Sequence, residues 1–403
     1  MMTTTVSRRK FMGVVGVAAG AWLARPAMPL AHPSTGSRVA VGMCRDYGSN
    51  VVETLGKMFD QLGGLEGLVR GKTVAIKINM TGTATSRLGH LPPGVTYWVH
   101  PQVVGATVHL LDKAGAQRIR LLESPWCTTE PLEEFMLHAN WEPRQFESAG
   151  RRVEFENTNY LGYGKKYSRF MVPHGGLMFK GYDLNHSYED CDVFVSVAKL
   201  KEHLTAGVTL SMKNCFGITP CTIYGDNAPE DEPGPAPLGG RGPIHSLNRL
   251  PPRSAPPAVD PSLFTAQSGE YRAGYSVPRV VADLVAARPI HLAIIDGIES
   301  MTGGEGPWAG SRYVKPGLLV AGTNCVATDA VGTALMGFDP MADRGTAPFE
   351  KCDSTLKLAE QLGVGRRDLK QIEVVGTPIA KAKFDFRKMG TERHEAGASA
   401  PRG

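Results

Sequence analysis

The sequence predicts an α/β fold, in which a mostly parallel or mixed sheet is flanked by helices and one long loop is inserted. Short apolar runs alternate with segments of helical periodicity from residue 39 to residue 375, the pattern of strands joined by helices. Hydrophobic residues make up 42% and charged residues 21% of the 403 residues, which excludes a disordered chain or a coiled coil. Ten of the 29 prolines fall within residues 226–261, which predicts a loop or lid there.

Local signals place each element in turn. Runs rich in β-branched residues, such as TVAIKIN at 73–79 and DVFVSVAK at 192–199, indicate strands. Pro101 suits the first turn of a helix and Gly115 its end. The predicted strands are 39–43, 73–79, 118–122, 152–155, 192–199, 291–296, 318–321 and 372–375, and the predicted helices are 101–114, 132–140, 205–216, 279–287 and 324–336.

The two ends of the chain differ from its body. The run SRRKFM at 7–12 precedes an apolar stretch, ending at Ala24, that is shorter than the roughly 20 residues needed to span a bilayer. This pattern resembles a twin-arginine export signal, although an ordinary secretion signal or an amphipathic anchor is the alternative. We predict a signal peptide at 1–31, a single α/β domain at 32–383 and a flexible tail at 384–403. A linker between two domains at 226–261 is the other possibility.

This organisation predicts a periplasmic or extracellular protein that the twin-arginine machinery exports, with no membrane span after cleavage. The net charge is +5, but residues 1–31 hold four basic residues and no acid, so the remainder is nearly neutral and no nucleic-acid partner is expected. Seven cysteines occur without a C-x-x-C pair, so an iron–sulfur cluster on this chain is not expected. Export permits disulfides, with Cys215 and Cys221 the nearest pair, but buried free thiols are favoured.

Polar residues gather where four predicted strands end. Lys77 and Asn79 end one strand, and Glu123 follows the next. Lys199 ends a third strand, and Asp296 ends a fourth. Ligands of α/β sheets bind at the carboxyl ends of strands, so these side chains are expected to converge on one edge if the sheet is parallel.

The third strand end carries the most positive charge. Extended geometry would place Lys199, Lys201 and His203 on one face, and helical spacing would place Thr209 and Lys213 together behind them. Neighbouring amines repel each other unless an anion lies between them, so the pattern predicts a pocket for a carboxylate or phosphate. A sheet edge whose lysines face water is the alternative.

Acidic residues could balance these lysines, or could bind a divalent metal together with His203. They form no local ligand motif, so their spacing does not decide between the two roles. Asp329 lies among small residues on a predicted helix and is expected to be buried and paired with a lysine. The candidates are Glu123, Asp296, Glu299, Glu305 and Asp329.

Other motifs give weaker signals. His100 suits the start of a helix, and Arg241 and His245 lie in the proline-rich loop, where they could reach over a site or be exposed. The glycine-rich run at 303–308 lacks the spacing of nucleotide-binding loops. No G-x-S-x-G motif is present, so the nucleophile elbow of α/β-hydrolases is absent.

Several motifs occur together in one order along the chain. They are KIN at 77–79, HP at 100–101, ESP at 123–125, VAKLKEH at 197–203, MKNCFG at 212–217, DGI at 296–298, GEGP at 304–307 and TDAV at 328–331. Over residues 38–340 they resemble the family labelled domain of unknown function 362. The resemblance implies the same fold and draws attention to the same residues, but it implies no reaction. Many members also resemble iron–sulfur proteins through an attached ferredoxin-like module, whose four-cysteine runs this sequence lacks.

Three hypotheses for function follow. The first is an exported enzyme acting on a small anionic molecule, in which one desolvated lysine acts as base or nucleophile. The second is an iron–sulfur or metal-linked redox or maturation accessory with a redox partner protein, and the third is a non-catalytic periplasmic ligand-binding protein. The candidate site residues are Lys199, His203 and Lys213 for catalysis, Lys77, Asn79, Lys201 and Asn214 for substrate binding, and Glu123, Asp296 and Asp329 for a divalent metal.

Overall fold

The structure is a computed structural model and describes residues 37–126, 128–159, 167–228, 240–248 and 268–387. The predicted signal peptide at 1–31, most of the proline-rich loop and the tail from residue 388 lie outside the described residues. Within the described part, no helix combines the length and the apolar character that crossing a membrane requires.

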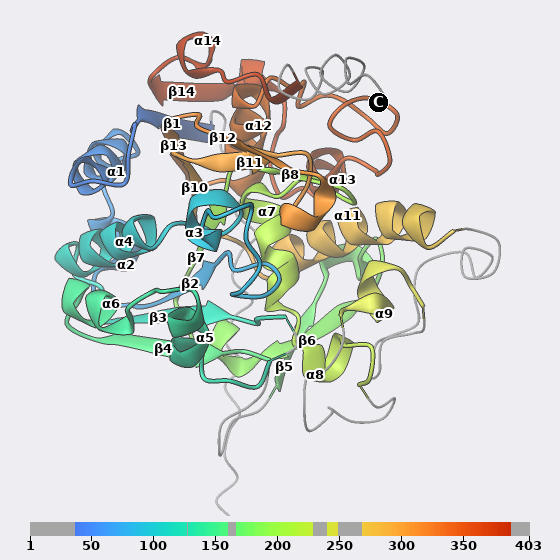
Figure 1. The fold of residues 1–403 in the computed structure, drawn as a ribbon, viewed down its shortest axis with the longest axis horizontal. Coiled ribbons are helices and arrows are strands. Elements are labelled where there is room, and N and C mark those ends of the chain that lie inside the picture. The colour runs from blue at the N-terminus through green and yellow to red at the C-terminus, as the bar shows by residue number, and fades with distance from the viewer. Residues whose placement is uncertain (1–36, 127, 160–166, 229–239, 249–267, 388–403) are drawn as a thin grey trace, which may run out of the picture. The chain divides into compact units, whose positions relative to one another are not determined.

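An eight-stranded sheet forms the centre of the fold (Figure 1). Its spatial order is β14-β1-β13-β10-β7-β2-β3-β4, and β13 is antiparallel to both neighbours while the other pairs are parallel. The eight predicted strands are these eight, with ends that agree within two residues, so the predicted mixed α/β sheet is confirmed. The strands are β1 (Ser37–Met43), β2 (Thr73–Ile78), β3 (Arg118–Glu123), β4 (Val153–Asn157), β7 (Val193–Lys199), β10 (Leu292–Gly297), β13 (Leu318–Gly322) and β14 (Ile372–Gly376).

Helices cover both faces of the sheet. Alternate strand residues point to opposite faces, so Ile294 and Ile295 of β10 belong to two different buried clusters. One cluster packs under α1 (Asn50–Gln61) and α4 (Pro101–Lys113). The other packs under α11 (Gly269–Ala287), α12 (Cys325–Leu335) and α13 (Thr355–Gln361).

Shorter elements connect these layers. Three two-stranded pairs that periodicity did not predict are β5 with β6, β8 with β9, and β11 with β12. Their bounds are β5 (Tyr167–Met171), β6 (Gly181–Asn185), β8 (Glu202–His203), β9 (Gly207–Val208), β11 (Ser300–Thr302) and β12 (Arg312–Val314). The short helices are α2 (Glu66–Val69), α3 (Pro93–Thr96), α5 (Leu132–His138), α6 (Pro143–Ala149), α7 (Leu210–Asn214), α8 (Cys221–Tyr224), α9 (Gly242–His245), α14 (Ile379–Ala382) and the 3₁₀ turns η1 (Pro173–Gly175), η2 (His186–Tyr188), η3 (Cys215–Ile218), η4 (Pro307–Ala309) and η5 (Leu369–Gln371).

Two predicted helices differ from the structure. The helix predicted at 205–216 is a tight β8–β9 turn followed by α7 and η3, because Gly207 adopts φ +73° and interrupts the helical path. The helix predicted from residue 279 begins ten residues earlier, since α11 continues through Pro278. Proline cannot donate to the carbonyl of Gly274, and the backbone N–H of Asp353 donates to it instead.

The topology confirms that the four polar strand ends converge. β10, β7, β2 and β3 are consecutive parallel neighbours, so their carboxyl ends lie at one edge of the sheet. Six cysteines fall within the described residues; all six are free and five of them are buried, as the sequence favoured.

Candidate functional site

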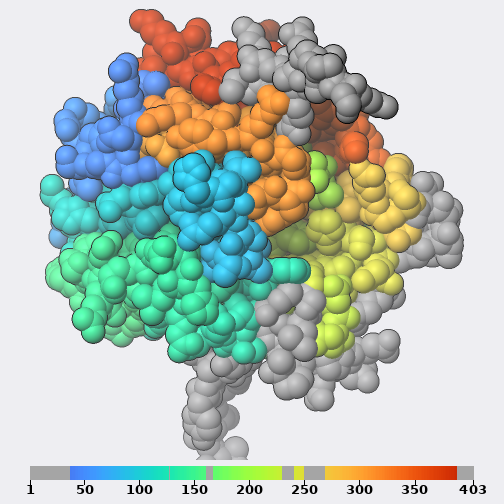
Figure 2. Space-filling view, viewed as in Figure 1, coloured from blue at the N-terminus to red at the C-terminus, as the bar shows by residue number. Residues whose placement is uncertain are grey.

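A cavity of about 670 Å³ lies where the segments after β2 and β3 meet α7 and residues 240–248. Figure 2 views the face on which the cyan segment after β2, the orange segment around η4 and the yellow-green segments of α8 and α9 meet around a hollow. Seven of the residues named as candidates line it: Lys77, Asn79, Glu123, His203, Lys213, Asn214 and Glu305. The weaker candidates Arg241 and His245 line it too.

An ion pair between Lys77 and Glu123 lies at one side of the cavity. The Nζ–Oε1 distance is 2.6 Å, and both side chains are buried. Glu123 also accepts from the backbone N–H groups of Met80 and Ser124, and Lys77 also donates to Asn214 Oδ1. Burial lowers the pKa of Lys77 and raises that of Glu123, so the pair lies closer to its neutral forms than free side chains do.

Lys199 and Asp296 form a second buried pair outside the cavity. They are register partners on β7 and β10, and their side chains meet at 2.8 Å. Lys199 also donates to Tyr47 Oη and to the carbonyls of Gly94 and Glu299. The amine therefore has a complete set of acceptors and does not line the cavity, so the structure does not place Lys199 where it could touch a ligand there.

Lys201 is held in a similar way. Its Nζ donates to the carbonyls of Tyr97 and Glu305, at 2.7 and 2.8 Å, and it lies at 3.5 Å from Thr81 Oγ1. It too is buried behind the cavity wall and does not line the cavity. The predicted stack of amines around one anion is therefore wrong for Lys199 and Lys201, because both are satisfied by protein acceptors.

The prediction that Asp329 is buried and paired with a lysine is only half right. It is buried as predicted, but its partner is not a lysine. Its carboxylate accepts from the backbone N–H groups of Ser211 and Met212 and from the Ser211 hydroxyl, which caps the start of α7. Burial raises the pKa of Asp329 to about 7.

The three proposed metal ligands do not meet. Glu123 is paired with Lys77, Asp296 with Lys199, and Asp329 caps α7. Among the described residues, no three His, Cys, Asp or Glu side chains are grouped closely enough to hold a metal ion. The structure therefore does not support the metal set predicted from strand ends, nor a ligand set of cysteines with His203 among those residues.

Replacement of Asp329 by alanine is expected to destabilise the protein by about 1–3 kcal/mol, because three buried donors lose their acceptor. Urea unfolding followed by circular dichroism measures the loss. The matched control is Asp368→Ala, which removes a capping aspartate near the surface that accepts only from exposed groups. An equal loss in the two variants would contradict the structural role given to Asp329.

Lys213 is half-buried and differs from the three buried lysines. Among the described residues its ammonium has no ion pair and no hydrogen bond, and its contact is the ring of Phe216, 4.5 Å from Nζ. Burial, and then the charges of Arg241 and Lys77, lower the pKa of Lys213 to about 7 although Glu305 opposes them. The amine lines the cavity, so this partly neutral group is open to a ligand.

Two further polar atoms of the lining have no partner within the described part. Thr209 Oγ1, one turn before Lys213, and Asn79 Oδ1 are buried without a hydrogen bond. Unsatisfied buried polar groups are costly, so each marks a place where a ligand or water would restore a bond. The predicted shared face of Thr209 and Lys213 is thus present in the cavity wall.

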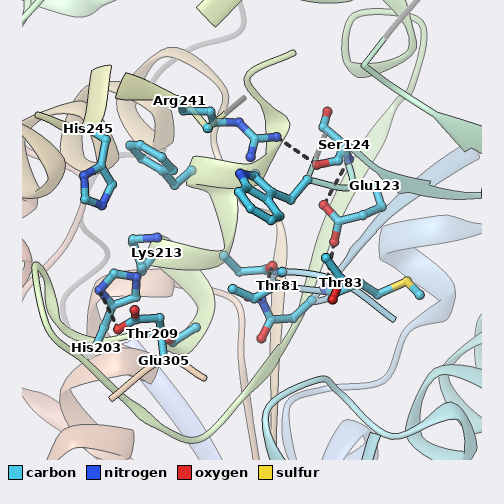
Figure 3. Close-up of a pocket in the computed structure, with 18 of the residues that line it drawn as sticks. Thr81, Thr83, Glu123, Ser124, His203, Thr209, Lys213, Arg241, His245 and Glu305 are labelled. Carbon is cyan, nitrogen blue, oxygen red and sulfur yellow. Dashed lines mark hydrogen bonds and ion pairs between the residues drawn. The ribbon is translucent and has the colours of Figure 1, made fainter. Parts of the chain in front are cut away.

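His203, Glu305 and Lys213 gather on one side of the cavity, across from Arg241 and Ser124 (Figure 3). Burial and the charge of Lys213 hold the pKa of His203 well below its usual value, so the ring is neutral. Its Nδ1 accepts from the Thr205 N–H at 3.2 Å, which leaves the proton on Nε2.

Glu305 stays ionised beside that neutral ring. Burial acts to raise the pKa of Glu305, but hydrogen bonds from Trp308 Nε1 and the Leu204 N–H act to lower it. Since His203 is itself neutral, those two hydrogen bonds are the contacts that keep the carboxylate charged. Glu305 thus places one negative charge at the side of the cavity that holds Lys213.

Comparison of the sequence with known families adds the identification. Residues 74–334 match the family described as Domain of unknown function (DUF362), which is more than half of the chain. The chain belongs to the DUF362 family. A search of curated proteins found no match.

Two solved structures resemble this DUF362 protein at low identity. One is a structural-genomics protein from Thermotoga maritima, with 14% identity and a TM-score of 0.34 over 62% of this chain and 50% of that chain. The other is the lactate racemase apoprotein from Thermoanaerobacterium thermosaccharolyticum, with 11% identity and a TM-score of 0.29 over 66% of this chain and 50% of that chain. The matched part thus spans about half the length of each.

Sequence reasoning missed part of the lining of this DUF362 site. Trp126 and Trp308 both line the cavity and are about half exposed, and neither was assigned a role. An exposed tryptophan beside a glycine-rich turn, as in the run GEGPW, is the signal that could have pointed to Trp308. Arg241 donates to the carbonyls of Thr219 and Ser124, contacts between distant segments that no local pattern predicts.

Proposed function

We propose that this DUF362 protein is an enzyme that binds a small organic anion, a carboxylate or a phosphate, in the cavity. In this proposal Lys213 is the group that transfers a proton or attacks the substrate. The supporting observation is a half-buried amine that lacks a polar partner among the described residues and faces a cavity. A lysine whose pKa lies near 7 can act as base or nucleophile at neutral pH.

Arg241 supplies the contact for the anion. Its Nε and one Nη2 hydrogen are engaged by backbone carbonyls, and the described residues give the guanidinium no ion pair with a carboxylate. The remaining N–H groups of a guanidinium bind carboxylate or phosphate oxygens well because their geometry matches. Lys77 also lines the cavity, but its ion pair with Glu123 balances its charge, so Arg241 is the cation left for the anion.

The buried lysines outside the cavity act in support. Lys199, the last residue of β7, and Lys201, two residues further on, tie this segment to the backbone at Gly94 and Tyr97. These bonds hold the chain that leads to His203. The predicted catalytic role of Lys199 and the binding role of Lys201 are thereby replaced by positioning roles in this proposal.

Binding is tested by titrating small carboxylates and phosphates against the protein and following tryptophan fluorescence, since two tryptophans line the cavity. Arg241→Met is expected to weaken binding by at least tenfold, because a hydrogen bond to a charged group contributes about 1.5–3 kcal/mol. Arg272→Met is the matched control: Arg272 anchors Ser246 of the same loop and does not line the cavity.

Catalysis is tested by incubating each bound anion with the protein and following it by nuclear magnetic resonance. Turnover that is lost in Lys213→Met supports the proposal. Binding without conversion of any anion would instead favour the non-catalytic ligand-binding protein, and failure of every anion to bind would contradict both. Periplasmic or extracellular localisation through residues 1–31 stays a prediction of the sequence.

A further inference from the structure

We infer that Lys213 forms an imine with a substrate that carries both a carboxylate and an aldehyde or ketone, the chemistry of a 2-oxo acid. This inference rests on the proposed function and narrows its substrate class. It assigns to Lys213 a covalent role, whereas the proposed function requires only that the amine meets a bound anion.

Three buried lysines and the half-buried Lys213 differ in what holds their amines. Lys77 has a carboxylate and an amide oxygen, Lys199 has a carboxylate and three further acceptors, and Lys201 has two carbonyls. Each of these amines donates its protons to the protein and is blocked from attack. Lys213 alone of the four lacks such acceptors among the described residues, and it alone is both unblocked and open to the cavity.

The surroundings of Lys213 suit attack on a carbonyl. Burial of the site disfavours the ammonium form relative to water, so a larger fraction of this amine carries a free lone pair than in an ordinary lysine. Thr209 Oγ1, one helical turn away on the same wall, has a hydroxyl proton without an acceptor in the described part. That hydroxyl can donate to the carbonyl oxygen as electrons move onto it.

The opposite side of the cavity suits the acid group. Figure 3 shows Arg241 across from Lys213, so one ligand can place its carboxylate at Arg241 and its carbonyl at Lys213. Trp126 and Trp308 add indole surface to the same cavity, and a volume of about 670 Å³ exceeds what pyruvate fills. The class is therefore 2-oxo acids with an apolar or aromatic substituent.

The step balances without an oxidant or a metal. The Lys213 nitrogen adds to the carbonyl carbon, the C=O π electrons move to oxygen, and a proton passes from nitrogen to oxygen to give a carbinolamine. The nitrogen lone pair then forms a C=N double bond as the C–O bond breaks, and the hydroxyl leaves as water with the second proton, which comes from nitrogen. The products are one imine and one water, which carries away the carbonyl oxygen and both amine hydrogens.

Reductive trapping tests the inference. The full protein is incubated at pH 7 with phenylpyruvate and cyanoborohydride, which delivers hydride to the imine carbon, and the chain is mapped by peptide mass spectrometry. We expect a single adduct, on Lys213, formed at least tenfold faster than on the exposed Lys57. The reason is that the neutral fraction of an ordinary lysine such as Lys57 at pH 7 is only on the order of one in two thousand.

Lys213→Arg keeps a positive charge but cannot be trapped, so it should bind the acid and give no adduct.

Phenyllactate has the carboxylate but no ketone, so it can occupy the anion site without forming an imine and separates the two proposals. If phenyllactate binds and phenylpyruvate labels the lysines at random, the imine is wrong and the anion site survives. If neither acid binds, the aromatic 2-oxo acid class is wrong whatever other anions bind. The adduct is mapped on the protein without any substitution, so the test does not depend on whether a variant folds.

Discussion

Replacement of Asp296 by alanine is expected to cost about 3–5 kcal/mol of stability, the loss that follows when one partner of a buried ion pair is removed. Asp296 and Lys199 are both fully buried, and their side chains meet at 2.8 Å across the centre of the sheet. The carboxylate also accepts from Tyr47 Oη and from the His100 N–H. Its removal takes the acceptor from the ammonium, from these two donors and from the Ile298 N–H, which also donates to it.

Urea unfolding measures this loss, and two variants make the result interpretable. Glu53→Ala breaks an exposed pair with Lys57 on α1 and should leave stability unchanged within error. The double variant Asp296→Ala with Lys199→Met should be more stable than Asp296→Ala alone, because it removes the uncompensated charge. If Asp296→Ala were as stable as Glu53→Ala, the pair would not stabilise this sheet.

The sheet could be predicted from the sequence because its signal is local. Each of the eight strands is a short apolar run bounded by turn residues, and the same runs pack between helices on both faces. The convergence of Lys77, Glu123, Lys199 and Asp296 at one edge then follows from parallel pairing alone. The residue pattern predicted this edge on the condition that the sheet is parallel, and the observed strand order brings the four ends together.

Their pairing could not be predicted, because it depends on contacts between distant segments. Lys199 and Lys201 were expected to face an anion, yet carbonyls at Gly94 and Tyr97 reach them from the segment around α3. Asp329 was expected to meet a lysine, yet the start of α7 supplies three donors. The sequence does not show which backbone carbonyls and N–H groups meet a side chain. The prediction, based on charged side chains alone, therefore overestimated the number of amines free to bind an anion.

Lys213 is expected to titrate near pH 7, about three pH units below an ordinary lysine. Competitive acetylation over pH 5–10, read by peptide mass spectrometry, gives its pKa directly, with the exposed Lys57 as the internal reference. Burial is the largest cause, followed by Glu305, which raises the pKa, and by Arg241 and Lys77, which lower it. The neutral rings of His203 and His245 line the same cavity and add no charge at this pH.

Removing a positive or a negative neighbour should shift the pKa of Lys213 in opposite directions. Arg241→Met removes a positive charge and should raise the pKa of Lys213, while Glu305→Gln removes a negative charge and should lower it. Each change should be about one pH unit, since charges several ångströms apart interact by about 1–2 kcal/mol at an effective dielectric near 20. Shifts of the same sign in both variants would show that general loosening of the cavity, rather than charge, controls the amine.

The lowered pKa of Lys213 also predicts how the stability of the protein changes with pH. Because the folded pKa of Lys213 lies below its unfolded value, the unfolded chain binds more protons between about pH 7 and pH 10.4, and stability contributed by this residue rises across that window. Lys213→Met lacks the titration, so it should be more stable than the parent at pH 7 and lose that advantage by pH 10. A difference that stays constant over the window would mean that Lys213 is an ordinary ammonium, which would remove the basis for its role as base or nucleophile.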